Sequence, residues 1–407
     1  MTSSKSGGPR AALTAFALLC VPVSLGGLTS SCWDYRASGS IGGLTGSAGA
    51  TSSGGSPGGG SGGSTTAGSG GSTAGADSLP CEVFENAGHP CVAAHSTVRV
   101  LVRGYSGSLY QVERPDRATQ DIGSVDGYAD AAAQDAFCSG GGCTIKIIYD
   151  QSPKGNHLTI APPGSAKPTW AKPAPADRHR IQVKGRMLYG ILFRPGEGYR
   201  SSCNECEYPD PFPSGTAVGD EAQTMYMVSS QHDLVNGCCF DYGNAEVTAN
   251  NDGNGTMEAV YLGQGVIWGT GVQGGPWVMA DLENGLFAGW ERGQDRNIST
   301  NTPLKHDFVT AVVVGDTADK NDGKGRFALY GADATAGPLT TMYDGIRPEK
   351  PGYVPMKKQG SVILSIGGDN SDFDGGRFYE GVMASGAATK QTLDALQASI
   401  VAAGYGK

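Results

Sequence analysis

The run Phe308-Val-Thr-Ala-Val-Val-Val314 decides the fold class, because consecutive β-branched residues favour an extended strand over a helix. Four further β-rich runs occur at residues 143–149, 223–228, 257–262 and 361–366. Turn-forming residues separate the runs, and only Thr389–Ala403 has the apolar spacing of a helix. We therefore predict an all-β domain with one C-terminal helix.

The strand-rich part of the chain covers residues 80–407. A segment of this length can bury a hydrophobic core of its own. Many short strands without an obvious repeat are typical of a large β-sandwich. We predict a single sandwich domain over this range.

The N-terminus has the pattern of an export signal. Lys5 and Arg10 precede an apolar run from Ala11 to Leu28, which Pro22 and two glycines interrupt. A membrane-spanning helix needs about 20 apolar residues, usually without such breaks. Residues 1–32 are therefore interpreted as a signal peptide or a lipoprotein signal.

Cys32 is a candidate for lipidation. It follows the small residues Thr29-Ser-Ser31, an arrangement that loosely resembles a bacterial lipoprotein processing site, although Leu usually occupies the position of Thr29. A lipidated Cys32 would attach the protein to a membrane, as in an outer-membrane lipoprotein. Plain secretion and an uncleaved anchor are the alternatives.

Residues 33–79 are predicted to be a flexible linker. No charged residue occurs between Ala37 and Ala76, where Gly, Ser, Thr and Ala predominate. Such a composition cannot bury enough apolar surface to fold. A Gly/Ser coil of about 40 residues spans roughly 35 Å, which would lift a domain clear of a cell surface.

The overall charge argues against one class of partner. The chain has 39 acidic and 30 basic side chains, a formal net charge of −9, and we find no run of Lys or Arg with interleaved aromatic residues. A nucleic-acid backbone would be repelled, so we expect no nucleic-acid partner. A neutral polysaccharide is compatible with this charge.

Ten cysteines in an exported protein indicate disulfides. Apart from Cys20 and Cys32, they fall in four close pairs: Cys81 and Cys91, Cys138 and Cys143, Cys203 and Cys206, Cys238 and Cys239. Local pairing is the simplest connectivity. Zinc at the third pair is the alternative, but a zinc site needs a second pair of ligands that the six histidines do not supply. We expect no metal and no cofactor.

The neighbouring Cys238 and Cys239 are unusual. A disulfide between them would form a rigid, apolar and polarisable surface for a ligand. Two free or differently paired thiols are the alternative. An oxidising compartment favours the disulfide.

Candidate catalytic carboxylates are those in apolar, strand-like surroundings, where desolvation of a charge is costly. They are Glu258, Asp281, Glu283, Asp369 and Glu380. Strand alternation predicts that Asp281 and Glu283 point to the same face. Asp369 follows a β-run and two glycines, so a turn can present it at a strand end. An ordinary capped turn is the alternative for this motif.

The chain from Cys81 to Gly404 resembles the α-L-arabinofuranosidase B catalytic domain of glycoside hydrolase family 54. The matching blocks are Cys81–Cys91 with the following Val-Ala-Ala-His-Ser, Ile148-Tyr-Asp-Gln-Ser, Gly155-Asn-His-Leu-Thr, Cys238-Cys-Phe-Asp-Tyr-Gly-Asn-Ala-Glu246, Gly275-Pro-Trp-Val-Met-Ala-Asp-Leu-Glu-Asn284 and Gly367-Gly-Asp-Asn-Ser371. Several long motifs in the same order make a chance similarity very improbable.

The resemblance implies a concanavalin-like or lectin-like β-sandwich (jelly roll) and a retaining, exo-acting α-L-arabinofuranosidase. Glu283 would be the nucleophile and Asp369 the general acid/base, the two carboxyl groups that retention requires. The resemblance also implies the disulfides Cys81–Cys91, Cys138–Cys143 and Cys238–Cys239. Further residues would line the arabinose pocket: Cys238, Cys239, Trp268, Asp281, Asn284 and Gly368.

The implied partner is an arabinose-containing plant polysaccharide or oligosaccharide, such as arabinan or arabinoxylan, and we expect a monomer. The sequence departs from the family at Gly285, where the family usually has Asn, and at Cys203 and Cys206, which have no recognised counterpart. Family members commonly carry a C-terminal arabinose-binding β-trefoil. Because this sequence ends at Lys407, before such a domain could begin, we expect attachment to arabinan or arabinoxylan to rely on the catalytic pocket. The alternative functions are a non-catalytic, lectin-like surface module and a glycosidase with another sugar.

Overall fold

The computed structural model describes residues 78–202, 213–291 and 296–407. All described residues belong to one compact unit. Several expectations lie outside the described residues: the signal over 1–32, Cys32, nearly all of the 33–79 linker, and the pairing of Cys203 with Cys206. Among the described residues, no helix is both long and apolar enough to cross a membrane.

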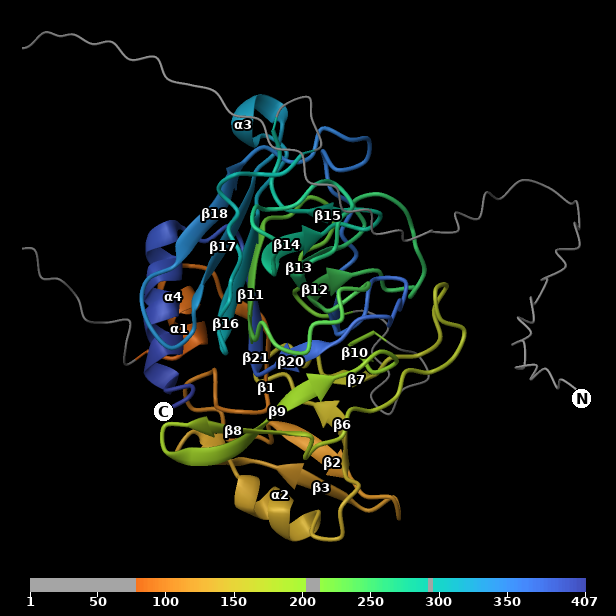
Figure 1. Cartoon of the computed structure of the whole chain (residues 1–407), viewed down its shortest axis with the longest axis vertical. Coiled ribbons are helices and arrows are strands. Elements are labelled where there is room, and N and C mark those ends of the chain that lie inside the picture. Colours follow the sequence, from red (N-terminus) through yellow and green to blue (C-terminus); the bar gives the residue numbers. More distant parts are fainter. Residues whose placement is uncertain (1–77, 203–212, 292–295) are drawn as a thin grey trace, which may run out of the picture. The chain divides into compact units, whose positions relative to one another are not determined.

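Two antiparallel sheets form the body of the described domain (Figure 1). The six-stranded sheet has the order β1 (Cys91–Ser96), β21 (Glu380–Ser385), β11 (Gln223–Ser229), β16 (Val309–Gly315), β17 (Phe327–Asp333) and β18 (Thr340–Gly345). The ten-stranded sheet has the order β15 (Leu286–Phe287), β14 (Trp277–Asp281), β13 (Glu258–Gly263), β12 (Asp241–Ala245), β19 (Ser361–Leu364), β10 (Tyr199–Arg200), β7 (Leu158–Ile160), β6 (Thr144–Ile148), β2 (Tyr110–Glu113) and β3 (Thr119–Ile122).

Two smaller sheets complete the domain: β20 (Gly376–Phe378) with β9 (Arg186–Phe193) and β8 (His179–Val183), and β4 (Ser124–Val125) with β5 (Tyr128–Ala129). The five predicted strand runs correspond to β6, β11, β13, β16 and β19. The predicted all-β sandwich is therefore confirmed.

The six-stranded sheet is buried on both faces. In β16, Ala311 and Val313 belong to the core that also contains Val260 and Val278 of the opposite sheet. The alternating residues Val312 and Val314 belong to a second core on the outer face. A strand places successive side chains on opposite faces, which explains why this run is almost continuously apolar.

Helix α4 (Lys390–Ala403) covers the outer face of the six-stranded sheet (Figure 1). The hydroxyl of Thr389 accepts a hydrogen bond from the backbone N–H of Thr392 at 3.2 Å and caps the helix, which ends at Gly404 with φ 82°. Leu396 and Ile400 of this helix lie in the second core. The predicted C-terminal helix is confirmed.

Three short helices were not predicted: α1 (Pro80–Asn86), α2 (Ala131–Phe137) and α3 (Lys320–Gly323). None is long enough to show a helical period in the sequence. The disulfide Cys81–Cys91 joins α1 to β1, and Cys138–Cys143 closes the segment between α2 and β6. Cys238–Cys239 lies just before β12. These are three of the four expected pairs.

The outer face of the ten-stranded sheet carries polar side chains. Asp241 of β12 pairs with Tyr261 of β13, and Asp281 of β14 pairs with Ala259. Their strand neighbours Tyr242 and Ala280 face the core between the two sheets. Asp241 and Asp281 therefore point away from that core.

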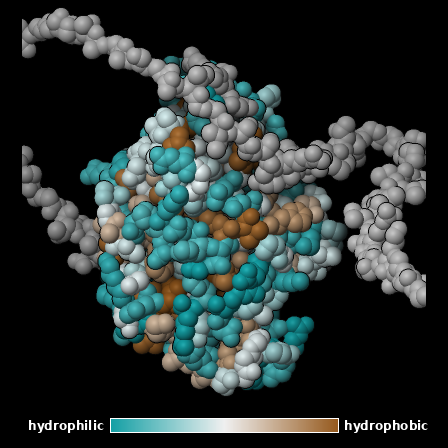
Figure 2. Space-filling view, in the orientation of Figure 1, coloured by the Kyte–Doolittle hydropathy of each residue, from teal (hydrophilic) through white to brown (hydrophobic). Residues whose placement is uncertain are grey.

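The molecular surface in Figure 2 is mainly hydrophilic around a smaller apolar area. The most exposed large apolar side chains among the described residues are Val125, Trp170, Met187, Val218, Val235, Val266, Ile267 and Phe373.

Candidate active site

Glu283 lies on a tight turn after β14. The strand ends at Asp281, Leu282 N–H donates to the Gly285 carbonyl at 3.1 Å, and both Glu283 and Asn284 have φ 60°. Left-handed conformations at residues other than glycine are strained and cluster at functional sites. Glu283 N–H donates to Asp281 Oδ1 at 3.2 Å. The prediction that strand alternation aligns these two carboxylates is therefore wrong, because a turn brings them together instead.

Asp369 lies on the loop that follows β19. Its Oδ1 accepts a hydrogen bond from the backbone N–H of Ser371 at 2.9 Å. Gly367 N–H donates to the Ser371 carbonyl, also at 2.9 Å. The carboxyl group thus belongs to a hydrogen-bonded turn, as the alternative interpretation expected, and it is also only partly buried.

Gly367 and Gly368 are needed for space. A Cβ atom on Gly368 would lie 1.8 Å from Glu246 Oε2 and 2.9 Å from Glu283 Oε2. A Cβ atom on Gly367 would lie 2.3 Å from Ser371 Oγ and 3.4 Å from Asp369 Oδ1. Neither glycine has a positive φ. The Glu283 carboxyl group thus lies beside Gly368, and the Asp369 carboxyl group lies beside the adjacent Gly367.

The site concentrates buried negative charge. Glu283 is 6% and Asp281 5% exposed. Burial raises the pKa of Glu283, and the neighbouring carboxylates of Glu246, Asp281 and Asp369 raise it further. Burial also raises the pKa of Asp281 to about 7, and burial together with the charge of Asp281 raises the pKa of Asp241.

Arg200 is a site residue that the sequence analysis missed. This fully buried side chain from β10 donates from Nη2 to the carbonyl oxygens of Glu246 at 2.8 Å and Gly368 at 2.9 Å, and from Nη1 to Asn370 Oδ1. It therefore holds both chain neighbours of Asp369. Burial lowers its pKa to about 10, which leaves it cationic at neutral pH.

Glu246 and Asp241 were also missed, although both lie in the quoted block around the vicinal cysteines. Each is fully buried. In the sequence they are marked only by their positions: Asp241 is the first residue of the short strand β12, and Glu246 directly follows its last residue. That pattern is common in strands, so it does not distinguish a site residue by itself.

The disulfide Cys238–Cys239 borders the carboxylates. The Cys239 sulfur lies 3.2 Å from Asp281 Oδ2 and 3.9 Å from Ser371 Oγ. The ligand atoms of Cys238, Cys239 and Asp281 lie within 4.8 Å of one another. Because both sulfur atoms are engaged in the disulfide, they cannot act as thiolate ligands for a metal.

Trp268 packs against the turn that carries Glu283. It is 6% exposed, and its ring meets Tyr353 edge-on with the centroids 4.8 Å apart. The ammonium of Lys350 lies 5.6 Å from its centroid. A Cβ atom on Gly285 would lie 1.9 Å from Trp268 Cζ2. The ring therefore occupies the space that a side chain at position 285 would need.

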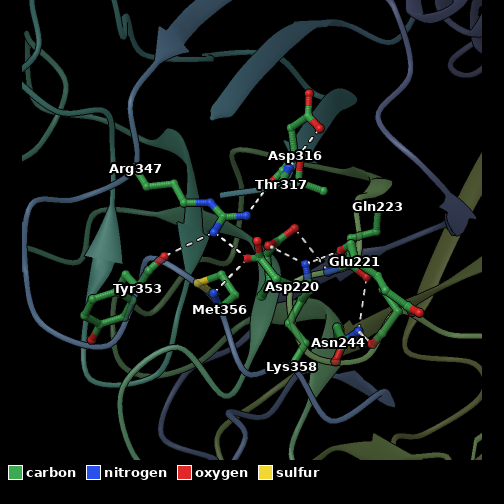
Figure 3. A network of polar contacts seen from close by, with 12 residues as sticks. Asp220, Glu221, Gln223, Asn244, Asp316, Thr317, Arg347, Tyr353, Met356 and Lys358 are labelled. Atoms are coloured by element: carbon green, nitrogen blue, oxygen red, sulfur yellow. Dashed lines mark hydrogen bonds and ion pairs between the residues drawn. The ribbon is translucent and has the colours of Figure 1, made fainter. Parts of the chain in front are cut away.

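A polar network supports the same turn from behind. The hydroxyl of Tyr353 donates to the Glu283 carbonyl at 2.7 Å, and the Tyr353 carbonyl accepts from Arg347 Nη1. Figure 3 shows the Arg347 guanidinium between Tyr353 and Asp220, with which it forms a 2.5 Å ion pair. Asp220 Oδ1 also accepts from the backbone N–H of Met356 at 2.8 Å. The loop from Arg347 to Met356 is thereby fixed against the Glu283 turn.

Asn284 is the exposed member of the expected set. Its side chain exchanges hydrogen bonds with Asn251 and Asn254, at 2.7 to 3.2 Å. The structure therefore gathers all the expected residues into one region: Glu283, Asp369, Cys238, Cys239, Trp268, Asp281, Asn284 and Gly368.

Two of the five candidate carboxylates lie elsewhere. Glu258 pairs with Lys358 at 3.3 Å, and both side chains are fully buried. Glu380 pairs with Arg99 at 2.6 Å and accepts hydrogen bonds from two tyrosine hydroxyls. Their apolar sequence surroundings thus reflect burial of an ion pair.

Comparison with known proteins gives a consistent result. Residues 80–406 match the family model described as "Alpha-L-arabinofuranosidase B, catalytic". The probable α-L-arabinofuranosidase B of Aspergillus clavatus is 47% identical over 337 residues, which cover 81% of this chain and 63% of the relative. The α-L-arabinofuranosidase B of Aspergillus oryzae is 46% identical and covers 80% of this chain and 62% of its own length. The chain thus spans less than two thirds of these relatives.

Solved structures agree with the sequence comparison. A GH54 α-L-arabinofuranosidase soaked with a cyclic sulfate inhibitor has a TM-score of 0.73 and 45% identity, covering 80% of this chain and 66% of that one. An arabinofuranosidase complexed with arabinofuranosyl-α-1,2-xylobiose has the same TM-score and 44% identity, covering 80% of this chain and 65% of that one. The chain belongs to the α-L-arabinofuranosidase B catalytic-domain family, glycoside hydrolase family 54.

Proposed function

We propose that this protein is a retaining, exo-acting α-L-arabinofuranosidase that releases terminal arabinofuranosyl residues from arabinan or arabinoxylan. The observation that supports the proposal is that the carboxyl groups of Glu283 and Asp369 lie beside two adjacent residues, Gly368 and Gly367. A retaining glycosidase needs two carboxyl groups close enough to act on one glycosidic bond.

Glu283 is proposed as the nucleophile. Its carboxylate attacks the anomeric carbon and forms a glycosyl ester, while Asp369 donates a proton to the departing oxygen. Water then attacks the ester, with Asp369 as the base, and the product keeps its anomeric configuration. The Ser371 N–H and the Arg200 contacts on both sides of Asp369 hold its carboxyl group in place for both steps.

The surrounding residues are proposed to bind the sugar. Asp281 accepts hydrogen bonds from arabinose hydroxyls, while the disulfide Cys238–Cys239 offers an apolar wall beside it. Trp268, Asn284 and Gly368 complete the set that the family resemblance indicates. The complex of a relative with arabinofuranosyl-α-1,2-xylobiose supports an arabinoxylan-type substrate.

The N-terminal residues support an exported protein. We propose that residues 1–32 direct export and that residues 33–79 tether the catalytic domain, which covers residues 80–407. Either lipidation at Cys32 or plain secretion would place the monomeric enzyme where plant polysaccharide is available.

The proposal is tested with 4-nitrophenyl α-L-arabinofuranoside and with arabinoxylan. The expected result is release of 4-nitrophenol and of arabinose, with the α-furanose as the first product by NMR. A Glu283→Gly variant should be inactive and should regain aryl-glycoside cleavage with azide. Binding of arabinoxylan without any hydrolysis would instead indicate the lectin-like module.

A further inference from the structure

Glu246 is a buried carboxyl group at the proposed nucleophile that the two-carboxylate mechanism does not use. We infer that Glu246 takes up the proton of Glu283 before catalysis and returns a hydrogen bond to the resulting carboxylate. It is thus a positioning residue for the nucleophile. The inference rests on the proposed arabinofuranosidase function.

The Glu246 carboxyl group is a close neighbour of Glu283 and raises the pKa of Glu283 further. Their Oε2 atoms both approach the Cα of Gly368, at 1.8 Å and 2.9 Å from the position a Cβ atom would take. Glu246 is fully buried, and its Oε2 receives no hydrogen bond from any other donor among the described residues. Two carboxylate oxygens in such contact can bond only if one of them carries a proton.

The other groups around Glu246 do not replace this proton. Arg200 directs Nη2 to the Glu246 carbonyl oxygen, and its charge lowers the pKa of the Glu246 carboxyl group by less than burial raises it. Thr256 donates its hydroxyl to the other carboxylate oxygen, Oε1. Burial raises the pKa of Glu246 and that of Glu283, which favours one shared proton at neutral pH.

Glu246 is also the best-placed acceptor for the proton of Glu283. Asp281 is the other close carboxylate, but its Oδ1 accepts the backbone N–H of Glu283 and its Oδ2 contacts the Cys239 sulfur. Asp369 lies beside Gly367 and is assigned to the leaving group. Transfer from Glu283 to Glu246 Oε2 therefore needs only a short movement within an existing contact.

The proposed reaction consists of a proton transfer, the formation of a glycosyl ester and its hydrolysis. The shared proton moves to Glu246, and ionised Glu283 forms a bond to the anomeric carbon with its other oxygen. The bond from that carbon to the leaving oxygen breaks, and that oxygen takes the proton of Asp369. Glu246 keeps its proton and donates to the ester oxygen, and hydrolysis of the ester by water restores the starting state.

The test measures the glycosylation step alone. The pre-steady-state burst of 4-nitrophenol from 4-nitrophenyl α-L-arabinofuranoside is followed from pH 4 to 10 for wild type, Glu246→Gln and Glu246→Leu. With this leaving group, proton donation by Asp369 contributes little, so the pH dependence reports the Glu246–Glu283 pair.

We expect the wild-type burst rate to fall at alkaline pH, when the pair loses its proton. Glu246→Gln can donate a hydrogen bond at every pH, so its burst rate should stay within about tenfold of wild type and lose the alkaline fall. Glu246→Leu removes the donor, so its burst rate should fall about 100-fold or more with a smaller change in the substrate dissociation constant.

Glu258→Gln is the matched control, because Glu258 is equally buried on a neighbouring strand but pairs with Lys358 outside the site. Its pH profile should match that of wild type. An alkaline fall that persists unchanged in Glu246→Gln would overturn the inference, even if Glu246→Leu fails to fold. Absence of 4-nitrophenol release by wild type would instead refute the proposed function itself.

Discussion

Two groups of buried carboxylates coexist in this domain and differ in their partners. Glu380 and Glu258, away from the site, each face one cation, Arg99 or Lys358, at 2.6 Å and 3.3 Å. In the site, Glu246, Glu283 and Asp281 crowd together. The buried Arg200 lies beside them, but its guanidinium donates hydrogen bonds to Asn370 and to two backbone carbonyls.

This difference in partners distinguishes carboxyl groups that are buried for stability from those that are buried for catalysis. A buried ion pair neutralises both members, so its removal on one side mainly affects folding. Carboxyl groups that outnumber the cations beside them are pushed toward their neutral forms, and such groups are typical of sites that transfer protons. The sequence surroundings of the two groups are equally apolar, so the partner rather than the burial identifies the site.

The largest expected effect comes from the site group. Glu283→Gln should lower kcat on 4-nitrophenyl α-L-arabinofuranoside by about 10⁴-fold, because it removes the proposed nucleophile. It should not lower the melting temperature, since it relieves repulsion among buried carboxylates. Calorimetry together with kinetics measures both. A destabilised variant that retains activity would place Glu283 in the structural group.

The structural group should respond in the opposite way. Glu380→Gln leaves Arg99 buried without its counterion and should cost about 3 to 5 kcal/mol of unfolding free energy. The folded fraction should keep a kcat within about twofold of wild type, because the ion pair lies outside the site. Urea unfolding measures the loss. The double variant Arg99→Met with Glu380→Leu should recover part of it, since no unpaired charge remains.

The sequence permits prediction of the strands better than of the site geometry. The β-branched run of β16 and the capped helix α4 carry their information locally, in side-chain type and spacing. The two seven-residue helices do not, because they are too short to show a period. Asp281 and Glu283 are close, as predicted, but a left-handed turn rather than strand alternation brings them together.

Glu246 and Arg200 show why the rest of the site could not be predicted. Arg200 acts through Gly368 and Asn370, and Glu246 acts through Glu283, all of them distant in sequence. A single sequence contains no record of which strands become neighbours. The family resemblance supplies the residues that would touch the sugar, but it does not supply those that hold them.

The stability of the protein should also depend on pH, because folding buries carboxyl groups and raises their pKa values. Burial raises the pKa of Asp281 to about 7 and that of Asp374, a second buried carboxyl group in the loop before β20, to about 6, so folding favours their protonated forms. This stabilisation is complete below their unfolded pKa of about 4 and is lost as the pH rises through the folded values. The melting temperature should therefore fall by several degrees between pH 5 and pH 8. Asp281→Asn should flatten that slope, as thermal unfolding followed across this pH range would show.

The smallest expected effect concerns the packing that supports the site turn. Gly285→Ala places a methyl group where Trp268 Cζ2 now lies and should cost about 1 to 3 kcal/mol through overpacking. Gly285→Asn introduces the usual family residue, but Trp268 must then leave its contact with the turn. A companion Trp268→Ala substitution makes room, so the double variant should be more stable than the sum of the single changes predicts. Additive losses in urea unfolding would mean that the Trp268 ring and the turn at Gly285 are not coupled. The presence of glycine at position 285 would then need an explanation other than the space taken by Trp268.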